Sequence, residues 1–166
     1  MAAAERFGAL AAAVERAVAD VDVIAGRTAQ AAQRVAQSPG DELVVYGAGA
    51  LLHGFYTEVE KAFQRIARDL DGFAPRGESW HAELLTDMSL DVPAVRPPVI
   101  SAALQRRLRP YLRFRHLFRN LYVLDLDGQR TCSLLQEVPA VWAEARAALL
   151  EFVAALRTMA PALRGD

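Results

Sequence analysis

Apolar residues recur every three or four positions through most of the 166-residue chain. The pattern runs along residues 2–37, 42–70 and 133–159. An α-helix has 3.6 residues per turn, so this spacing gathers the apolar side chains on one face of a helix. The period-two alternation that is typical of strands occurs only weakly, at residues 121–127. The sequence therefore predicts a nearly all-α chain in which each helix buries one face.

Turn-forming residues indicate where these helices begin and end. The cluster Ser38–Asp41 predicts a turn, with Asp41 capping the helix that follows. Gly72 is placed to end that second helix. We expect a short helix from Ser79 to about Met88, and then an extended connection over Val92–Val99, which holds three prolines.

Two prolines fall within the remaining predicted helices. Pro110 lies inside a helix expected from Ser101 to Tyr122, so we expect a kink or a break near Arg107–Arg109. Pro139 lies near the expected start of the last helix, where proline is tolerated. Four long helices and one short one, with mostly short connections, predict an antiparallel four-helix bundle with one extra helix.

Composition limits the class of protein. A hydrophobic content of 53% suits one folded domain over residues 1–166. The single cysteine, Cys132, excludes an internal disulfide framework and a cysteine-based zinc site. No apolar run approaches the roughly 20 residues of a membrane span. Because Glu5, Glu15 and Asp20 interrupt the alanine-rich start, we expect no secretory signal and a cytoplasmic protein.

Charge is distributed unevenly, although the net charge is only −1. Residues 92–124 contain seven arginines and no acid, so this stretch carries +7 and the rest of the chain −8. The seven are Arg96, Arg106, Arg107, Arg109, Arg113, Arg115 and Arg119. Arginine binds phosphate bidentately, which makes the stretch a candidate site for a polyanion such as RNA. The alternative is that these arginines are solvated or pair with acids on neighbouring helices.

Polar chemistry is concentrated in residues 113–122. The polar members are Arg113, Arg115, His116, Arg119, Asn120 and Tyr122. At roughly 100° per residue, Arg115, Arg119 and Tyr122 lie within about 60° of one another on a helix. Such side chains bind phosphate, transfer protons near neutral pH and stabilise a charged transition state. This helix is therefore the candidate functional site.

Other motifs favour structural roles. Gly47 and Gly49 form an incomplete G-x-G with no preceding strand, so we interpret them as close helix packing rather than nucleotide binding. The histidines His53, His81 and His116 lack the spacing of helical metal ligands. His53 fits a partly buried side chain, and His81 fits capping, packing or function. We expect no metal and no cofactor.

At these residues the chain resembles the HEPN superfamily, and specifically the HepT-like toxin ribonucleases. Their signature is Arg, a polar residue, three variable positions, His, one variable position and Tyr. Arg115 matches the arginine and His116 the polar residue. Asn120 occupies the histidine position, and Tyr122 matches the tyrosine. Further similarity lies in residues 52–57, 78–81 and 96–100.

The resemblance implies a homodimeric helical bundle that cuts RNA at a composite site between two signature helices. It implies a metal-independent endoribonuclease toxin of a type II, or AMPylation-controlled, toxin–antitoxin pair. The implied partner is a nucleotidyltransferase-type antitoxin that adds AMP to Tyr122. The implied catalytic positions are Arg115, His116 and Asn120, with Arg109, Arg113 and Arg119 binding phosphate.

Asn120 departs from the signature, because an amide does not titrate at neutral pH. One interpretation is that His116 supplies the imidazole, and its separation from Arg109 by six residues meets a looser form of the signature. Another is a degraded site, in a helical module that binds RNA or a partner protein without cutting. A third is a structural bundle whose arginines are all paired internally.

Overall fold

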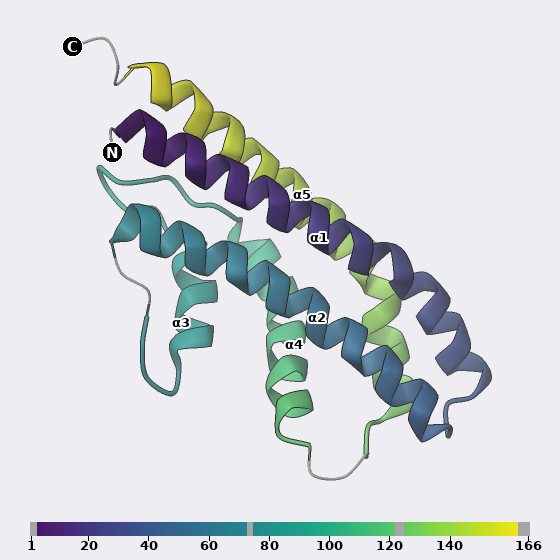
Figure 1. Cartoon of the computed structure of the whole chain (residues 1–166). Coiled ribbons are helices and arrows are strands. Elements are labelled where there is room, and N and C mark those ends of the chain that lie inside the picture. The colour runs from purple at the N-terminus through teal and green to yellow at the C-terminus, as the bar shows by residue number, and fades with distance from the viewer. Residues whose placement is uncertain (1–2, 73–74, 122–124, 163–166) are drawn as a thin grey trace.

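The computed structural model describes residues 3–72, 75–121 and 125–162, and these residues form helices and no strand (Figure 1). The predicted all-α class is confirmed. In chain order the elements are α1 (Ala3–Gln37), α2 (Glu42–Ile66), the π-helical turn η1 (Ala67–Asp71), α3 (Trp80–Asp87), α4 (Ala102–Arg119) and α5 (Gly128–Ala162).

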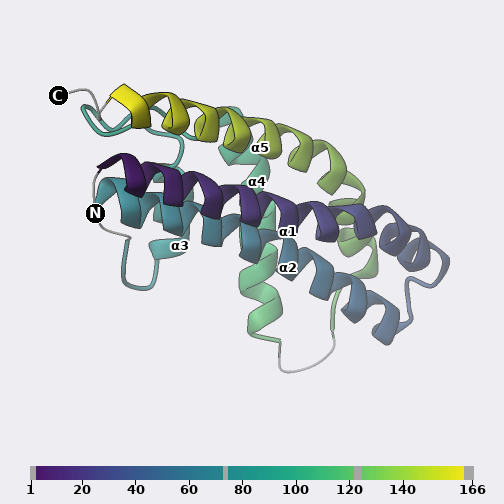
Figure 2. The ribbon, with the colours of Figure 1, turned by 45° about the horizontal axis from the view of Figure 1, so that its top comes forward.

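Three long helices run side by side, and two shorter ones cross them. α1 packs along α2 and α5 and runs antiparallel to both (Figures 1 and 2). α4 crosses this layer obliquely and contacts both α2 and α5, with α3 beside it. The result is a helical bundle in which the predicted signature helix is the oblique one.

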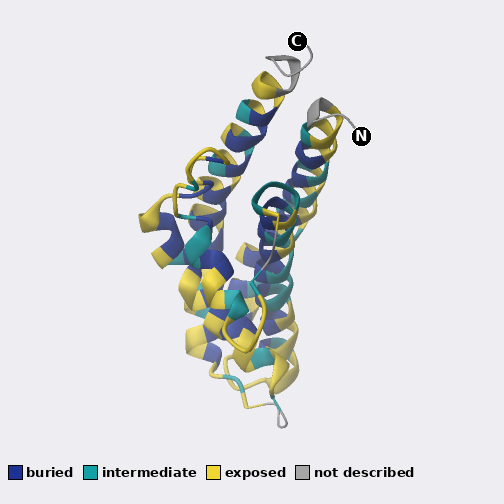
Figure 3. Cartoon of the chain, turned by 90° about the vertical axis from the view of Figure 1, so that its left-hand side faces the viewer, coloured by how far each residue is buried: buried dark blue, intermediate teal, exposed yellow. Residues whose placement is uncertain are grey.

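Each helix turns a stripe of buried residues inward and exposed residues outward (Figure 3). At the centre, the ring of Phe55 forms T-shaped contacts with Tyr111 and Trp142, which joins α2, α4 and α5. The Trp142 indole N–H donates to the Asp22 carboxylate at 2.7 Å, and the Tyr111 hydroxyl donates to the Leu134 carbonyl at 3.0 Å. These bonds satisfy the polar ends of the two large side chains and link α5 to α1 and α4.

Local signals set most helix ends as predicted. The Asp41 carboxylate accepts hydrogen bonds from the backbone N–H groups of Leu43 and Val44, which confirms it as the cap of α2. Gly72 follows η1 with φ +80°, a conformation that favours glycine. The π-helical turn before it was not predicted.

Two expectations about the later helices are wrong, namely a break at Pro110 and the start of α5. α4 is unbroken through Pro110. Pro110 has no backbone N–H, so the carbonyl of Arg106 loses its helical hydrogen bond. Both residues are exposed, so this missing hydrogen bond lies on the solvent side of the helix. α5 begins at Gly128, five residues before the expected start, because the Asp127 carboxylate accepts from the Arg130 N–H. Pro139 is therefore inside α5, on its exposed face.

The connection between α3 and α4 is a closed turn rather than the extended strand of chain expected from its prolines. Val92 and Arg96 form an antiparallel bridge, with Ala94 at φ +61° between them. Arg96 is 3% exposed, and its guanidinium donates to both oxygens of Asp71 at 2.8 and 2.7 Å. This buried pair fixes the turn against the end of η1, and so fixes where α4 starts.

Gly49 packs as predicted, because a Cβ there would lie 3.0 Å from the Phe118 ring of α4. Gly47 has open space instead. Within the described ranges no helix has the length and apolar character needed to cross a membrane.

Replacing glycine by alanine at two helical positions should change stability in opposite directions. Gly128→Ala places a Cβ 2.4 Å from the Pro39 carbonyl oxygen, so we expect a loss of about 1–3 kcal/mol in the free energy of unfolding. Gly26→Ala, in open space on α1, should gain up to about 1 kcal/mol. Urea denaturation measures both. Equal effects would contradict the close approach of α5 to the α1–α2 turn.

Candidate functional site

α4 presents polar side chains on two faces. One carries exposed basic residues, and the other carries Arg115, which is only 8% exposed and faces α2 and α3. Arg115 and His116 are adjacent in sequence but point in different directions, because successive residues on a helix are rotated by about 100°. The predicted catalytic pair is therefore separated within one chain.

Arg115 belongs to a buried cluster with Glu60 of α2 and His81 of α3. An Nη2 atom of Arg115 lies 3.2 Å from Oε2 of Glu60, which is 3% exposed. The other carboxylate oxygen of Glu60 lies 2.6 Å from Nδ1 of His81. Nη1 of Arg115 lies 3.5 Å from both ring nitrogens of His81, so the guanidinium sits over the imidazole. We call these three residues the Glu60 cluster.

Hydrogen bonding in the Glu60 cluster orients the His81 ring. A carboxylate only accepts hydrogen bonds, so Nδ1 of His81 is the donor. In the neutral ring, Nε2 then carries the lone pair that can accept a proton. The Trp80 ring also lies against the imidazole, with ring centroids 3.5 Å apart. The side chain of His81 is 17% exposed. The ring is therefore held in one orientation at the edge of the bundle rather than in its interior.

Several buried polar atoms next to the cluster lack a hydrogen-bond partner among the described residues. They are Nε2 of His53, the hydroxyl of Tyr56, Oγ1 of Thr57 and Nε of Arg115. The first three come from adjacent turns of α2, on the side that carries Glu60. Burying a polar group without a partner costs free energy, so these atoms leave hydrogen-bonding capacity unused in this part of the bundle.

Burial keeps two of these groups uncharged. It lowers the pKa of His53 below its ordinary value, and the positive charges of Arg115 and Arg119 lower it further. It raises the pKa of Tyr56, and the Glu60 carboxylate adds to that rise. Both side chains are therefore neutral hydrogen-bonding groups at neutral pH, beside a charged guanidinium.

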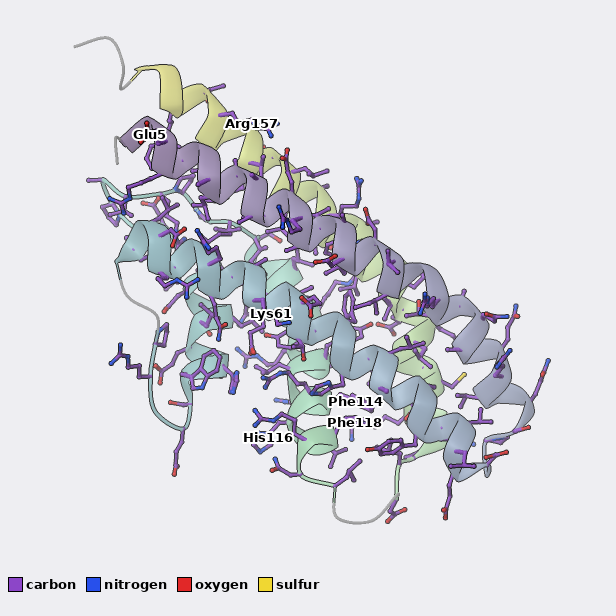
Figure 4. The ribbon with its side chains drawn as sticks, viewed as in Figure 1. Glu5, Lys61, Phe114, His116, Phe118 and Arg157 are labelled. Carbon is purple, nitrogen blue, oxygen red and sulfur yellow. The ribbon has the colours of Figure 1, made fainter. Side chains whose placement is uncertain are left out.

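The exposed face of α4 carries a strip of basic and polar side chains. Its members are Arg106, Arg109, Arg113, His116 and Asn120, spaced by three or four residues. No ion pair holds these three arginines within the part of the chain that the structure describes. His116 lies on the side of α4 away from Phe114 and Phe118, which face α2 (Figure 4). We call this set the α4 strip.

Arg119 links the α4 strip to the Glu60 cluster. It is exposed, and it lies four residues after Arg115 and three after His116, so it occupies the helix surface between them. Its positive charge reaches His53. Positively charged side chains therefore continue from the α4 strip toward Arg115, along a path that could contact successive phosphates.

Asn120 ends α4. Its side-chain amide donates to the His116 carbonyl at 2.8 Å, and the residue is exposed. Tyr122, the expected modification site, lies outside the described residues.

The seven arginines of residues 92–124 divide between two roles. Three pair with acids of the same chain: Arg96 with Asp71, Arg107 with Glu144 and Arg115 with Glu60. The remaining four are exposed. Both alternatives for the basic stretch thus apply, to different residues.

Of the Glu60 cluster, sequence reasoning named Arg115 as a site residue and left His81 open between capping, packing and function, but it missed Glu60. A signal was present, because Glu60 follows Tyr56 by four residues and precedes Phe63 by three on the buried side of its helix. A carboxylate at such a position needs a charged partner. Over the described residues, no three His, Cys, Asp or Glu side chains gather as a metal site requires.

A comparison with protein-family models matches residues 47–156 to the HepT-like protein family. The match includes α3, α4, most of α2 and most of α5, and therefore the whole Glu60 cluster. No curated protein and no solved structure matches the chain.

Stability should reveal the coupling between Glu60 and Arg115. Glu60→Leu removes the carboxylate partner of the buried Arg115 guanidinium, so it should lower the free energy of unfolding by about 3–5 kcal/mol. Arg115→Met removes the cationic partner of the buried Glu60 carboxylate and should cause a loss of similar size. The double variant should cost at least about 1 kcal/mol less than the sum of the two, because no charge remains unpaired.

Urea denaturation of the four proteins measures this coupling. The surface pair Arg157–Glu15, at 59% and 36% side-chain exposure, is the matched control and should couple by less than about 1 kcal/mol. Additive losses at Glu60 and Arg115 would show that the pair is not coupled.

Proposed function

Because the chain belongs to the HepT-like family, we propose that it is a metal-independent endoribonuclease. The observation that carries the proposal is the position of Arg115. This residue matches the signature arginine, its guanidinium is held at the edge of a buried polar cluster, and its Nε has no partner among the described residues. A held guanidinium beside neutral hydroxyl and imidazole groups suits the charge that develops on a phosphate under attack.

The α4 strip supports RNA as the substrate. Arg109 and Arg113 would bind backbone phosphates, and Arg119 would guide the next phosphate toward Arg115. In this proposal His116 and Asn120 contact the RNA from the same strip. Exposed arginines at helical spacing form a track for phosphates and carry no sequence preference of their own.

We propose that the active form is a homodimer joined near the end of α4. Apolar side chains are exposed at this end of the bundle, on the first turns of α2 and the last turn of α4. They are Leu43 at 78%, Leu117 at 45% and Tyr46 at 37%. Tyr46 contacts Phe118, with ring centroids 4.9 Å apart, which joins the α2 part of the patch to the end of α4. Leu117 lies four residues after Arg113, next to the α4 strip, so a second copy bound to the patch would bring two strips together.

The biological setting is also proposed. The protein would act in the cytoplasm as the toxin of a toxin–antitoxin pair, with a nucleotidyltransferase-type antitoxin that modifies Tyr122. An AMP group on Tyr122, three residues after Arg119 in the sequence, would add negative charge to the basic stretch and compete with RNA phosphates.

One observation favours a second function, RNA binding without cleavage. Asn120 stands where the signature has histidine, and its amide is engaged as a helix cap. A protein of this kind would bind RNA through the α4 strip and leave it intact.

Cleavage can be tested directly with a fluorescent single-stranded RNA in the presence of EDTA. We expect products ending in a 2′,3′-cyclic phosphate, and no cleavage of the same sequence as DNA. Arg115→Lys keeps the positive charge but loses the planar guanidinium, so its rate should fall by about 100-fold or more. Arg157→Ala, on α5 at the far end of the bundle, should keep the wild-type rate (Figure 4).

Light scattering should give the mass of a dimer for the same preparations. Folded, dimeric wild-type protein that leaves the RNA intact would overturn the endoribonuclease proposal. Binding by that inactive protein would establish the second function.

Binding to an uncleavable 2′-O-methyl RNA tests the α4 strip separately. Replacing Arg109 and Arg113 by alanine should weaken binding and lower the slope of log K against log[salt] by about 0.7 per lost phosphate contact. The control is the pair Arg16→Ala and Arg27→Ala on the exposed side of α1, which removes the same charge. Equal losses in both double variants would contradict a localised strip.

A further inference from the structure

We propose that His81 of α3, oriented by Glu60, is the group that transfers the proton during RNA cleavage. The inference rests on the proposed endoribonuclease function and names the imidazole that the signature position lacks. His81 is the catalytic residue in this proposal, and Glu60 is its positioning residue.

Geometry favours His81 over the other two histidines. His81 lies against Arg115, with Nη1 3.5 Å from both ring nitrogens, so a phosphate held by Arg115 would be beside the imidazole. His116 is exposed on the α4 strip and shares no side-chain hydrogen bond with any described residue. His53 has a lowered pKa and Nε2 without a partner, which suits hydrogen bonding more than proton uptake.

The contact with Glu60 gives His81 the arrangement that a general base needs. The carboxylate holds Nδ1 at 2.6 Å, so Nε2 is the nitrogen left to accept a proton. Once His81 is protonated, the same carboxylate stabilises the imidazolium. Contact with the tilted Trp80 ring restrains the imidazole further, so little freedom remains to be lost when the substrate binds.

The step is a transesterification within the RNA. Nε2 of His81 takes the proton of a 2′-hydroxyl, and the 2′-oxygen forms a bond to the adjacent phosphorus. The bond from phosphorus to the 5′-oxygen breaks, and that oxygen takes a proton from water. His81 then returns its proton to the solvent. The products are a 2′,3′-cyclic phosphate and a 5′-hydroxyl.

Arg115 would serve the phosphate in this step. Its guanidinium lies beside the His81 ring, with Nη1 3.5 Å from both ring nitrogens, and it can donate to a phosphate oxygen at the edge of the bundle. A lower local dielectric than that of water strengthens such bonds. Tyr56 is 0% exposed and is not placed to contact a substrate.

The decisive experiment compares kcat with binding for His81→Ala and His81→Gln. We expect kcat on single-stranded RNA to fall by about 100-fold or more in both variants, which is the range for loss of a general base. Affinity for the 2′-O-methyl RNA should change by less than about threefold, since the α4 strip is intact. Thr86→Ala, on the same helix outside the cluster, should match the wild type.

Chemical rescue separates proton transfer from a structural role. Added imidazole should restore part of the kcat of His81→Ala, whereas pyrazole, which has a similar shape but is a far weaker base, should not. Glu60→Gln, which keeps a hydrogen bond to the ring without the charge, should lower kcat and leave 2′-O-methyl RNA binding unchanged.

His81→Gln retains an amide that can donate to Glu60, so it is the variant to rely on if His81→Ala fails to fold. Wild-type kcat in His81→Gln would overturn the inference while leaving the endoribonuclease proposal in place. The same holds if His116→Ala, and not His81→Ala, loses kcat and is rescued by imidazole. Absence of cleavage by wild-type protein would instead be a failure of the proposed function itself.

Discussion

A carboxylate buried between two helices must be paired, and in this chain Glu60 is paired with Arg115. The pair joins α2 to α4 where the oblique helix crosses the bundle, and His81 brings α3 to the same point. A buried ion pair adds little stability compared with apolar packing of the same volume, yet removing one of its two partners destabilises the fold strongly. It therefore specifies one docking angle of α4 rather than adding much stability. The same specificity gives Arg115 and His81 a fixed relation to each other.

The features that could be predicted from sequence are those that depend on neighbouring residues. Asp41 caps α2 from two and three positions away, and the apolar stripes of α1 and α2 follow from helical spacing alone. The Glu60 cluster depends on contacts across 21 and 34 residues, which no local pattern encodes. The start of α5 was missed for a different reason: the Asp127–Arg130 contact is local, but the residues around Asp127 also fit an ordinary turn.

The basic stretch shows why charge counted along a sequence is an incomplete guide to a binding surface. Arg96 holds a turn in place, Arg107 pairs on the surface, and Arg115 is buried, so the exposed positive charge is smaller than the sum. The exposed arginines that remain are not scattered, since Arg109 and Arg113 both lie on the α4 strip. Arg119 then occupies the surface between that strip and Arg115. The polar side chains of this helix, predicted as one candidate site, lie on two faces that Arg119 joins at the last turn.

Charge balance explains how a cluster that is neutral overall could serve a reaction that builds negative charge. Glu60 and Arg115 cancel, so a phosphodiester bound there would bring a single negative charge. Attack by the 2′-oxygen adds a second charge to the phosphorane. In the proposed step the proton leaves the hydroxyl for His81, and the added negative charge appears together with an imidazolium beside it. The total charge of the site then stays constant through the transition state, so little reorganisation of the surrounding protein is required. An asparagine at the signature position does not prevent this, provided that the imidazole comes from α3.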